Sequence, residues 1–220
     1  MADIRLRKIF EEASKLFINK GYARTQMGFI AKESGISIGA IYSLFTSKKA
    51  IYDFVLKCVA DKTYLDSEFE LPIKEEDFSG LHEEIIKLFK QNNLNFETGL
   101  GDSSYCFEQM LSDAFDIISE YGAGFLIFQQ NGSDSGELYK NYISFRKAFC
   151  NDVEKYVNIF IQKGEIRELD YPEHHARLII ETLSWWGMHV RYDAFETNAS
   201  VSPEIAKEVA INALKHAHLI

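Results

Sequence analysis

The sequence predicts an all-α protein, and two observations carry that prediction. Only 3 prolines and 13 glycines occur among the 220 residues, and apolar residues recur at spacings of three and four along most of the chain, which is the pattern of a helix with one buried face. Apolar residues make up 46% of the chain and charged residues 26%, as in a globular protein and not a disordered or fibrous one. We therefore expect one large domain, or a small domain joined to a medium one.

The first helix is expected over residues 4–20. Gly21 follows it, where a left-handed residue would end the helix, and Thr25 is placed to cap a second helix over residues 26–34. Gly35 ends the second helix in the same way. The residues expected to face inward are Leu6, Ile9, Phe10, Ala13, Leu16 and Phe17 in the first helix and Phe29 and Ile30 in the second.

A third, short helix is expected over residues 38–45, with Ser37 as its cap. The break before it is so short that the two helices must cross at a steep angle, which is the helix-turn-helix geometry. Ile41 and Phe45 lie one turn apart and are expected to face inward. The outward face then carries Ile38, Gly39, Tyr42 and Ser43.

Helices are expected through the rest of the chain as well. Ser47 is placed to cap a fourth helix that begins at Lys48, and an acidic stretch over residues 71–79 separates it from a helical body. Pro172 and Pro203 each suit the first turn of a long helix. The remaining apolar stripes lie within residues 81–89, 107–118 and 138–162, and the two helices opened by proline run to about Tyr192 and His218.

Charge is distributed unevenly along the chain. The net charge is −9, but residues 1–60 carry 10 Lys or Arg against 5 acids, a net +5, and the remaining residues carry a net −14. A basic head on an acidic body indicates that only the head meets a polyanion such as DNA. The alternative is that these cations form an ordinary solvated face.

The sequence predicts a cytoplasmic protein without metal, cofactor or enzymatic activity. Cys58, Cys106 and Cys150 show no metal-binding or paired spacing, so we expect reduced thiols. No apolar run is long enough to cross a membrane, and the charged N-terminus does not suit an export signal. Phosphate-binding loops and nucleophile elbows are also missing from the sequence, and the histidine pairs lack ligand spacing.

The first 57 residues resemble the DNA-binding domain of the TetR family of bacterial regulators. The resemblance covers about a quarter of the chain, and its motif is more specific than a general helix-turn-helix. It implies an N-terminal three-helix DNA-binding domain over residues 1–47, a connecting helix over 48–66, and a helical ligand-binding and dimerisation domain over 67–220. The matching residues are Ile9-Phe-Glu-Glu-Ala-Ser-Lys-Leu-Phe17, Lys20-Gly-Tyr22, Thr25, Ile30-Ala31, Ser34-Gly-Ile-Ser37, Gly39-Ala-Ile-Tyr42, Phe45 and Ser47-Lys48.

The resemblance also implies which residues contact double-stranded DNA. Helix N-termini offer N–H groups to phosphate, Tyr42 and Lys48 can reach the backbone, and Gly39 lets the third helix approach the groove closely. Ser43, expected to be uncommitted, could donate or accept at a base edge. The implied contact residues are Thr25, Gln26, Ser37, Ile38, Gly39, Tyr42, Ser43 and Lys48. The alternative for Tyr42 is packing on the fourth helix.

Two departures from the family pattern remove polar groups from the expected recognition face. The family usually has Lys where this chain has Ile38, and commonly an aromatic or His where it has Leu44. We therefore expect weaker binding to the DNA phosphates, and we expect Ile38 to pack on a thymine methyl group instead.

For the body, the resemblance implies a homodimer formed through the last two long helices. The expected interface residues are Ala176, Ile180, Leu183, Gly187, Val209 and Leu214. The alternative is that these stripes pack inside one chain.

The body is also implied to hold a small hydrophobic or aromatic ligand, since aromatic side chains are common in such sites. The candidates are Phe107, Glu108, Phe115, Phe125, Phe145, Phe149 and Trp185. A cationic ligand is favoured if Glu108, Asp113 or Asp116 points inward. The alternative is a plain aromatic core.

These expectations describe a homodimeric transcriptional regulator, most often a repressor in this family, that a ligand releases from its operator. The alternative is a TetR-like protein-interaction module with weak or no specific DNA binding. Neither the ligand nor the operator can be read from the sequence.

Overall fold

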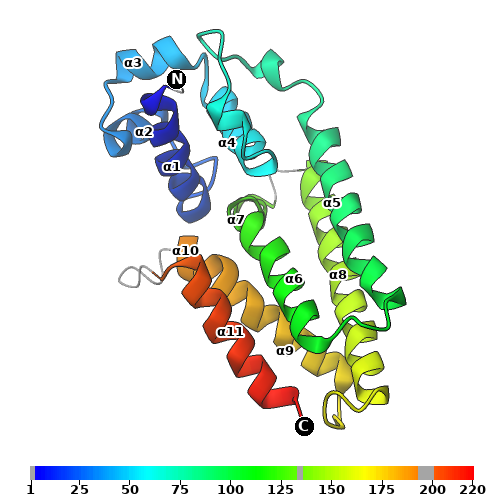
Figure 1. Cartoon of the computed structure of the whole chain (residues 1–220). Helices are drawn as coiled ribbons and strands as arrows, with labels where there is room; N and C mark the ends of the chain where they lie inside the picture. Colours follow the sequence, from blue (N-terminus) through cyan, green and yellow to red (C-terminus); the bar gives the residue numbers. More distant parts are fainter. Residues whose placement is uncertain (1–2, 133–135, 193–200) are drawn as a thin grey trace. The chain divides into compact units, whose positions relative to one another are not determined.

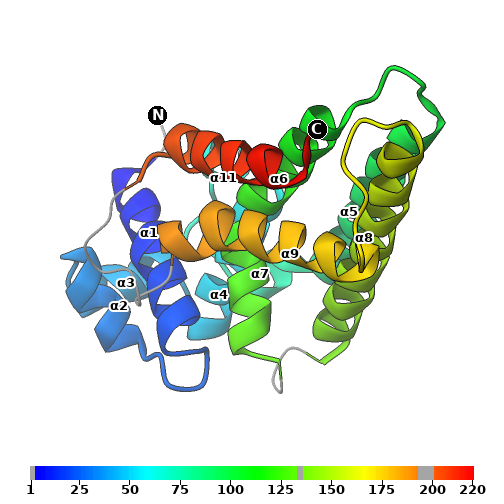
Figure 2. The same ribbon diagram turned by 90° about the horizontal axis from the view of Figure 1, so that it is seen from below.

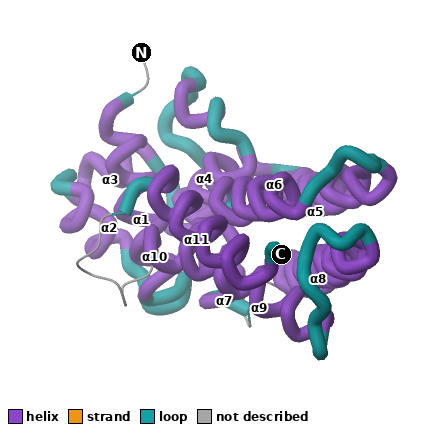
Figure 3. The backbone as a smooth tube through the Cα atoms, turned by 60° about the horizontal axis from the view of Figure 1, so that its bottom comes forward, coloured by secondary structure: helices purple, strands orange, loops and turns teal. Residues whose placement is uncertain are grey.

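The protein is helical throughout the part that the structure describes. The computed structural model describes residues 3–132, 136–192 and 201–220, and in these residues the backbone forms helices, turns and loops without a strand (Figures 1 and 3). The predicted all-α class is confirmed. Across the same ranges, every helix is too short or too polar to span a lipid bilayer.

The chain folds into two compact units that alternate along the sequence. The first consists of Met1–Ile86 together with Ala123–Tyr139, and the second of Lys87–Gly122 and Lys140–Ile220. A segment more than a hundred residues from the N-terminus thus packs with the first helices. The functional division after residues 47 and 66 stays a prediction.

The first unit begins with the four helices that the sequence predicted. Ser37 and Ser47 cap the third and fourth helices as expected, since each hydroxyl accepts a hydrogen bond from a backbone N–H 3.1 Å away. The expectation for Thr25 was wrong, because Gln26 occupies the N-cap of the second helix and forms no side-chain cap. The α-helices of this unit are α1 (Ile4–Asn19), α2 (Met27–Ser34), α3 (Ile38–Leu44), α4 (Lys48–Ala60), the start of α5 (Leu81–Thr98), nearly all of α7 (Gly122–Gln130) and the start of α8 (Gly136–Gln162).

The core of the first unit lies between α1, α2 and α4. Ile9, Phe17 and Ile30 are fully buried there, with Phe54 on α4. The Phe17 ring meets the Tyr52 ring edge-on at 5.2 Å between centroids, a favoured aromatic geometry. Apolar burial therefore fixes α4 against the first two helices, and α3 follows from the turn after α2.

The second unit packs α9 and α11 against α6. Helix α6 contacts both α9 and α11, and α9 contacts α11 (Figure 2). Pro172 and Pro203 stand in the first turns of their helices, as predicted. The helices of this unit are the remainder of α5, α6 (Phe107–Glu120), most of α8 (Gly136–Gln162), α9 (Pro172–Ser184), α10 (Val190–Tyr192) and α11 (Pro203–His218).

A π-helical turn over Trp185–His189 joins α9 to α10. Gly187 within this turn packs closely on α6, and Gly122 at the start of α7 packs closely on the turn. A Cβ atom on Gly122 would lie 2.8 Å from the Met188 Cβ, and one on Gly187 would lie 3.2 Å from the Ile118 Cγ2. Gly187 therefore serves the internal packing of the second unit.

Two histidines meet between α9 and α11. The Nδ1 of His175 lies 3.0 Å from the Nε2 of His218, whose own Nδ1 lies 2.8 Å from the Leu214 carbonyl oxygen. Since that oxygen can only accept, His218 Nδ1 carries a proton, and Nε2 accepts from His175. His218 is fully buried, and desolvation lowers its pKa. The hydrogen bond to Leu214 opposes this lowering, and the nearby His175 and Arg167 add to it.

The lowered pKa of His218 predicts a pH-dependent stability. The unfolded chain takes up a proton at His218 near the ordinary value of about 6.5, whereas the folded chain resists it. The free energy of unfolding should therefore be highest above that pH and fall as the pH drops below it. Replacement His218→Asn, which keeps a donor toward Leu214, should make the decline in melting temperature between neutral and mildly acidic pH shallower.

His216→Asn is the matched control for this measurement. The Nδ1 of His216 also faces a carbonyl of α11, that of Asn212 at 2.7 Å, but its side chain is exposed. The His216 variant should retain the wild-type pH dependence, and equal slopes for the wild type and the His218 variant would contradict the prediction.

Candidate nucleic-acid interface

The third helix presents the outward face that the sequence predicted. Gly35 adopts φ +66° and ends α2, and Ser37 then caps α3. On α3, Ile38 is 46% exposed and Tyr42 is 55% exposed. A Cβ atom on Gly39 would meet nothing within 4 Å, so the missing side chain leaves open space toward solvent. The exposure of Tyr42 argues against its packing on α4.

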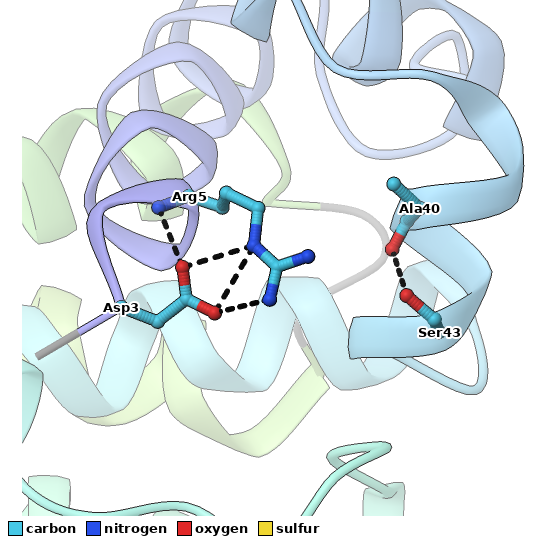
Figure 4. Close-up of polar contacts among 4 residues, drawn as sticks. All are labelled: Asp3, Arg5, Ala40 and Ser43. Atoms are coloured by element: carbon cyan, nitrogen blue, oxygen red, sulfur yellow. Dashed lines mark hydrogen bonds and ion pairs between the residues drawn. The ribbon is translucent and has the colours of Figure 1, made fainter.

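Ser43 is on this face, but it is not uncommitted. Its hydroxyl donates to the Ala40 carbonyl oxygen at 2.8 Å (Figure 4). The proton is therefore engaged, and the side chain faces solvent mainly as a hydrogen-bond acceptor. In the same view, Asp3 caps α1 and pairs with the Arg5 guanidinium, which lowers the pKa of Asp3.

Thr25 and Lys48 hold the turn between α1 and α2. Thr25 is fully buried, and its hydroxyl donates to the Gly21 carbonyl oxygen at 2.8 Å. The Lys48 ammonium donates to the carbonyl oxygens of Tyr22 at 2.7 Å and Thr25 at 2.9 Å, and lies 4.1 Å from the Tyr22 ring centroid. The Thr25 side chain is therefore turned into the unit, and Lys48 has two of its three donors engaged there. The predicted DNA contacts of both residues stay predictions.

Two other side chains lie on faces opposite to those expected. Leu44 is fully buried, so its departure from the family pattern takes nothing from the recognition face. Phe29, expected to face inward, is 40% exposed, with the Lys20 ammonium 4.8 Å from its ring centroid. Gln26 is exposed at the start of α2, as the implied contact requires.

Beneath the interface, α4 carries a buried carboxylate. Asp53 is 4% exposed and pairs with Lys49 one turn earlier. Burial raises the pKa of Asp53, and the hydrogen bond from Lys49 opposes that rise. Lys49 is therefore committed to neutralising an internal charge.

The residues expected at a dimer interface are mostly inside the second unit. Ala176, Ile180, Leu183 and Leu214 are at most 3% exposed, and Gly187 is buried against α6, so this stripe packs within one chain. The physical reason is that α6 covers that face of α9 and α11. Of the expected set, Val209 is exposed. Other exposed apolar residues on these helices are Leu178, Trp185 and Ile205.

The expected ligand residues fall into separate groups. Phe145 and Phe149 on α8 pack against Phe89 and Phe96 of α5, with ring centroids 5.1 Å and 4.5 Å apart. Phe107 packs against Phe160 and His218, while Phe115 is buried elsewhere on α6. Phe125 is buried in the first unit.

Two expected ligand residues point to solvent instead. Glu108 pairs with Lys215 of α11 at 2.6 Å and is 58% exposed, because the buried stripe of α6 turns it outward. Trp185 is 43% exposed and stacks on His189. The inward Glu108 that would favour a cation is not found.

Sequence reasoning missed a polar pair beside the aromatic rings. The Oδ1 of Asn93 is buried without a hydrogen-bond partner, although Asn93 Nδ2 lies 3.5 Å from the Phe145 carbonyl oxygen. The Asn92 side chain interacts with the Tyr121 hydroxyl. Both asparagines continue the apolar stripe of Leu88 and Phe89 at helical spacing, so the spacing alone could have placed them inside. Unpartnered buried polar atoms call for an explanation.

The geometry of α2 and α3 defines a helix-turn-helix protein, and comparison with known proteins gives the type of its head. The model of bacterial regulatory proteins of the tetR family matches residues 9–54. The helix-turn-helix head of this chain is therefore of the TetR type.

Similarity to individual relatives is highest in the head. An uncharacterised HTH-type transcriptional regulator, YuxN of Bacillus subtilis, is 48% identical over 56 residues, which span 26% of this chain and 19% of YuxN. The biofilm operon icaADBC negative transcriptional regulator IcaR of Staphylococcus aureus is 27% identical over 150 residues, 68% of this chain and 67% of IcaR.

Solved structures extend the fold similarity to the whole chain. The ketosteroid transcriptional regulator KstR2 of Mycobacterium tuberculosis matches 98% of this chain and 95% of its own, with a TM-score of 0.57 and 18% identity. The TetR family regulator PfmR of Thermus thermophilus gives a TM-score of 0.51 at 20% identity over 94% of this chain and 91% of its own. At these identities the likeness concerns the fold.

The role of Lys48 in the turn predicts a loss of stability in Lys48→Met. This variant leaves the Tyr22 and Thr25 carbonyl oxygens without their charged donor, and hydrogen bonds to charged groups contribute about 1.5–3 kcal/mol each. We expect the free energy of unfolding in urea to fall by about 1.5 kcal/mol or more. Lys15→Met, at an exposed lysine paired with Glu12, should change it by less than about 0.5 kcal/mol. Equal stabilities of the two variants would refute this role.

Proposed function

We propose that the protein is a homodimeric transcriptional regulator that binds operator DNA through α3 and that a small molecule in the second unit releases from DNA. The observation that carries the proposal is the outward face of α3, where Ile38 and Tyr42 stand about half exposed on either side of the open Gly39. The name of IcaR as a negative regulator favours repression as the mode of action.

In the proposed complex, each exposed side chain has a distinct role. Ile38 packs on a thymine methyl group, Ser43 accepts a hydrogen bond from a base amino group, and Tyr42 contacts phosphate. Gln26 reaches phosphate from the start of α2. Thr25 and Lys48 act indirectly, because both are engaged in the turn that sets the position of α2.

The proposed dimer uses the exposed face of α9 and α11. Leu178 and Trp185 on the α9 side and Ile205 and Val209 on α11 are each 41–54% exposed. A helix has 3.6 residues per turn, so Leu178 and Ile180, two positions apart, lie on roughly opposite sides of α9. The side of Ile180 is buried in its own unit, and the side of Leu178 is free for a partner. A two-fold contact would cover the same residues on both chains.

The proposed ligand is a neutral, largely apolar or aromatic molecule with a polar group. Rings of α5 and α8 supply apolar surface, and the unpartnered Asn93 Oδ1 supplies a hydrogen-bond acceptor. Glu108 and Asp116, whose inward orientation would have favoured a cation, pair with Lys215 and Lys207.

Substitutions on α3 should change DNA binding in two different ways. Duplexes selected from a random pool, and DNA flanking the gene itself, serve as probes in fluorescence anisotropy across a salt series. Tyr42→Phe should weaken binding to every selected duplex by about threefold to tenfold, because one hydrogen bond to phosphate is lost. Ile38→Ala should weaken binding mainly to duplexes with thymine at one position. Wild-type affinity should fall steeply with salt.

Tyr171→Phe is the control for Tyr42→Phe, since Tyr171 is 62% exposed but belongs to the second unit. It should leave DNA affinity unchanged. Failure to select any preferred duplex, or a binding constant that does not respond to salt, would favour the protein-interaction module over the regulator.

A charge on the exposed face of α9 should break the dimer. Leu178→Glu places a carboxylate at the proposed contact, and we expect the dimer dissociation constant to rise at least about tenfold. Ile4→Glu adds the same charge at a residue of α1 that is 70% exposed and should leave assembly unchanged. Light scattering would report a mass near 25.3 kDa for the first variant and twice that for the control. A dimeric Leu178 variant would contradict this interface.

A further inference from the structure

A buried asparagine connects the end of α7 to the turn that precedes α2. Asn131 is 3% exposed and directly follows α7. Its Oδ1 accepts a hydrogen bond from the Tyr22 N–H at 2.5 Å, and its Nδ2 donates to the Ile127 carbonyl oxygen at 2.6 Å and lies 3.5 Å from that of Phe17. The Tyr22 contact joins residues 109 positions apart in the sequence, within the same compact unit.

Both ends of this side chain meet backbone groups at or just after helix ends. Phe17 lies in the last turn of α1 and Ile127 in the last turn of α7, where helix carbonyl groups run out of N–H partners within the helix. The Ile127 carbonyl oxygen accepts both the backbone N–H of Asn131, at 3.0 Å, and its side-chain amide. An asparagine amide offers two donors and one acceptor oxygen on a short side chain. It can therefore bind Tyr22 N–H while its amino group faces two helix C-termini.

The backbone opposite Asn131 fits it closely. Gly21 adopts φ +80°, and a Cβ atom there would lie 3.2 Å from the Asn131 Oδ1. Gly21 therefore provides both the left-handed turn and the space for the asparagine. Glycine is therefore required at position 21 for two reasons. It ends α1 in the left-handed conformation, and any side chain there would crowd Asn131.

The contact continues from the turn into the helix-turn-helix. Tyr22, whose N–H is held by Asn131, offers its carbonyl oxygen to Lys48 of α4, which also holds the Thr25 carbonyl. The Tyr22 ring meets the Tyr52 ring edge-on at 5.0 Å. Helix α2 begins two residues after Thr25, so the position of this turn determines the start of α2 and, through the short break at Gly35, the position of α3.

We infer that Asn131 is a positioning residue for DNA binding. It fastens the turn at residues 20–25 to α7 and thereby sets the orientation of α2 and α3. A displacement of α7 moves the Tyr22 amide and transmits the change to the recognition helix. The inference rests on the proposed function and names a side chain outside the helix-turn-helix on which that function depends.

The test combines hydrogen exchange without DNA and binding with DNA, both on the full-length chain. In Asn131→Ala, exchange in peptides covering residues 17–26 should accelerate at least tenfold, while peptides from α6 keep their wild-type protection. Affinity for duplexes selected by the wild type should fall about tenfold. Asn131→Asp retains the acceptor for Tyr22 N–H and removes the donor. Exchange over residues 17–26 should therefore also accelerate in this variant, but less than in Asn131→Ala.

Asn158→Ala is the matched control. The Nδ2 of Asn158 donates to the Glu154 carbonyl oxygen of its own helix at 2.9 Å, the same kind of bond as that to Ile127, but in the second unit. It should change neither measurement.

The two readouts separate failure of the inference from failure of the proposed function. Unchanged exchange over residues 17–26 in both Asn131 variants would overturn the inference. Faster exchange with DNA affinity within twofold of wild type would also overturn it, because the turn would then not govern binding. A wild type that selects no DNA, with accelerated exchange in the variants, would instead overturn the regulator function on which the inference rests.

Discussion

The arrangement of the DNA-binding helices depends on how the polar backbone of one short turn is satisfied. Between α1 and α2 the chain reverses over residues 20–25 while its peptide groups are partly withdrawn from water, and unpaired buried backbone groups are costly. Thr25, Lys48 and Asn131 supply the missing partners from the turn itself, from α4 and from the end of α7. Apolar packing brings these helices together, and these hydrogen bonds select the orientation that α2 takes.

Local signals in the sequence were sufficient to predict the helices and the tight turn. Ser37 and Ser47 as caps, Gly35 as a left-handed end and the prolines of the last two long helices act within a few residues of the backbone groups they satisfy. The partners of Thr25 and Lys48 could not be predicted in the same way. Lys48 reaches carbonyls 23 and 26 residues earlier, and the sequence contains no signal of which cations turn inward.

Periodicity also failed to distinguish the two apolar faces of α9 and α11. An apolar stripe at spacings of three and four shows that a helix face is buried. It does not show whether a helix of the same chain or a partner chain covers that face. Ala176, Ile180 and Leu183 formed the regular stripe, and in the structure α6 covers it. Leu178 and Trp185 lie seven residues apart and outside the regular stripe, so they gave a weaker signal, although they are the ones that remain exposed.

Part of the positive charge of residues 1–60 lies in the same turn. Of the ten cations in residues 1–60, five form ion pairs, namely Arg5, Arg7, Lys15, Lys49 and Lys57, and Lys48 is held by carbonyls. Within the described residues, the cations outside these contacts are Lys8, Lys20, Arg24 and Lys32, of which Lys20 and Arg24 stand in the turn and Lys32 on α2. All four are exposed. In the proposed complex, phosphate contacts from these residues fix the register, so the turn that orients α2 also places part of the positive charge that DNA meets.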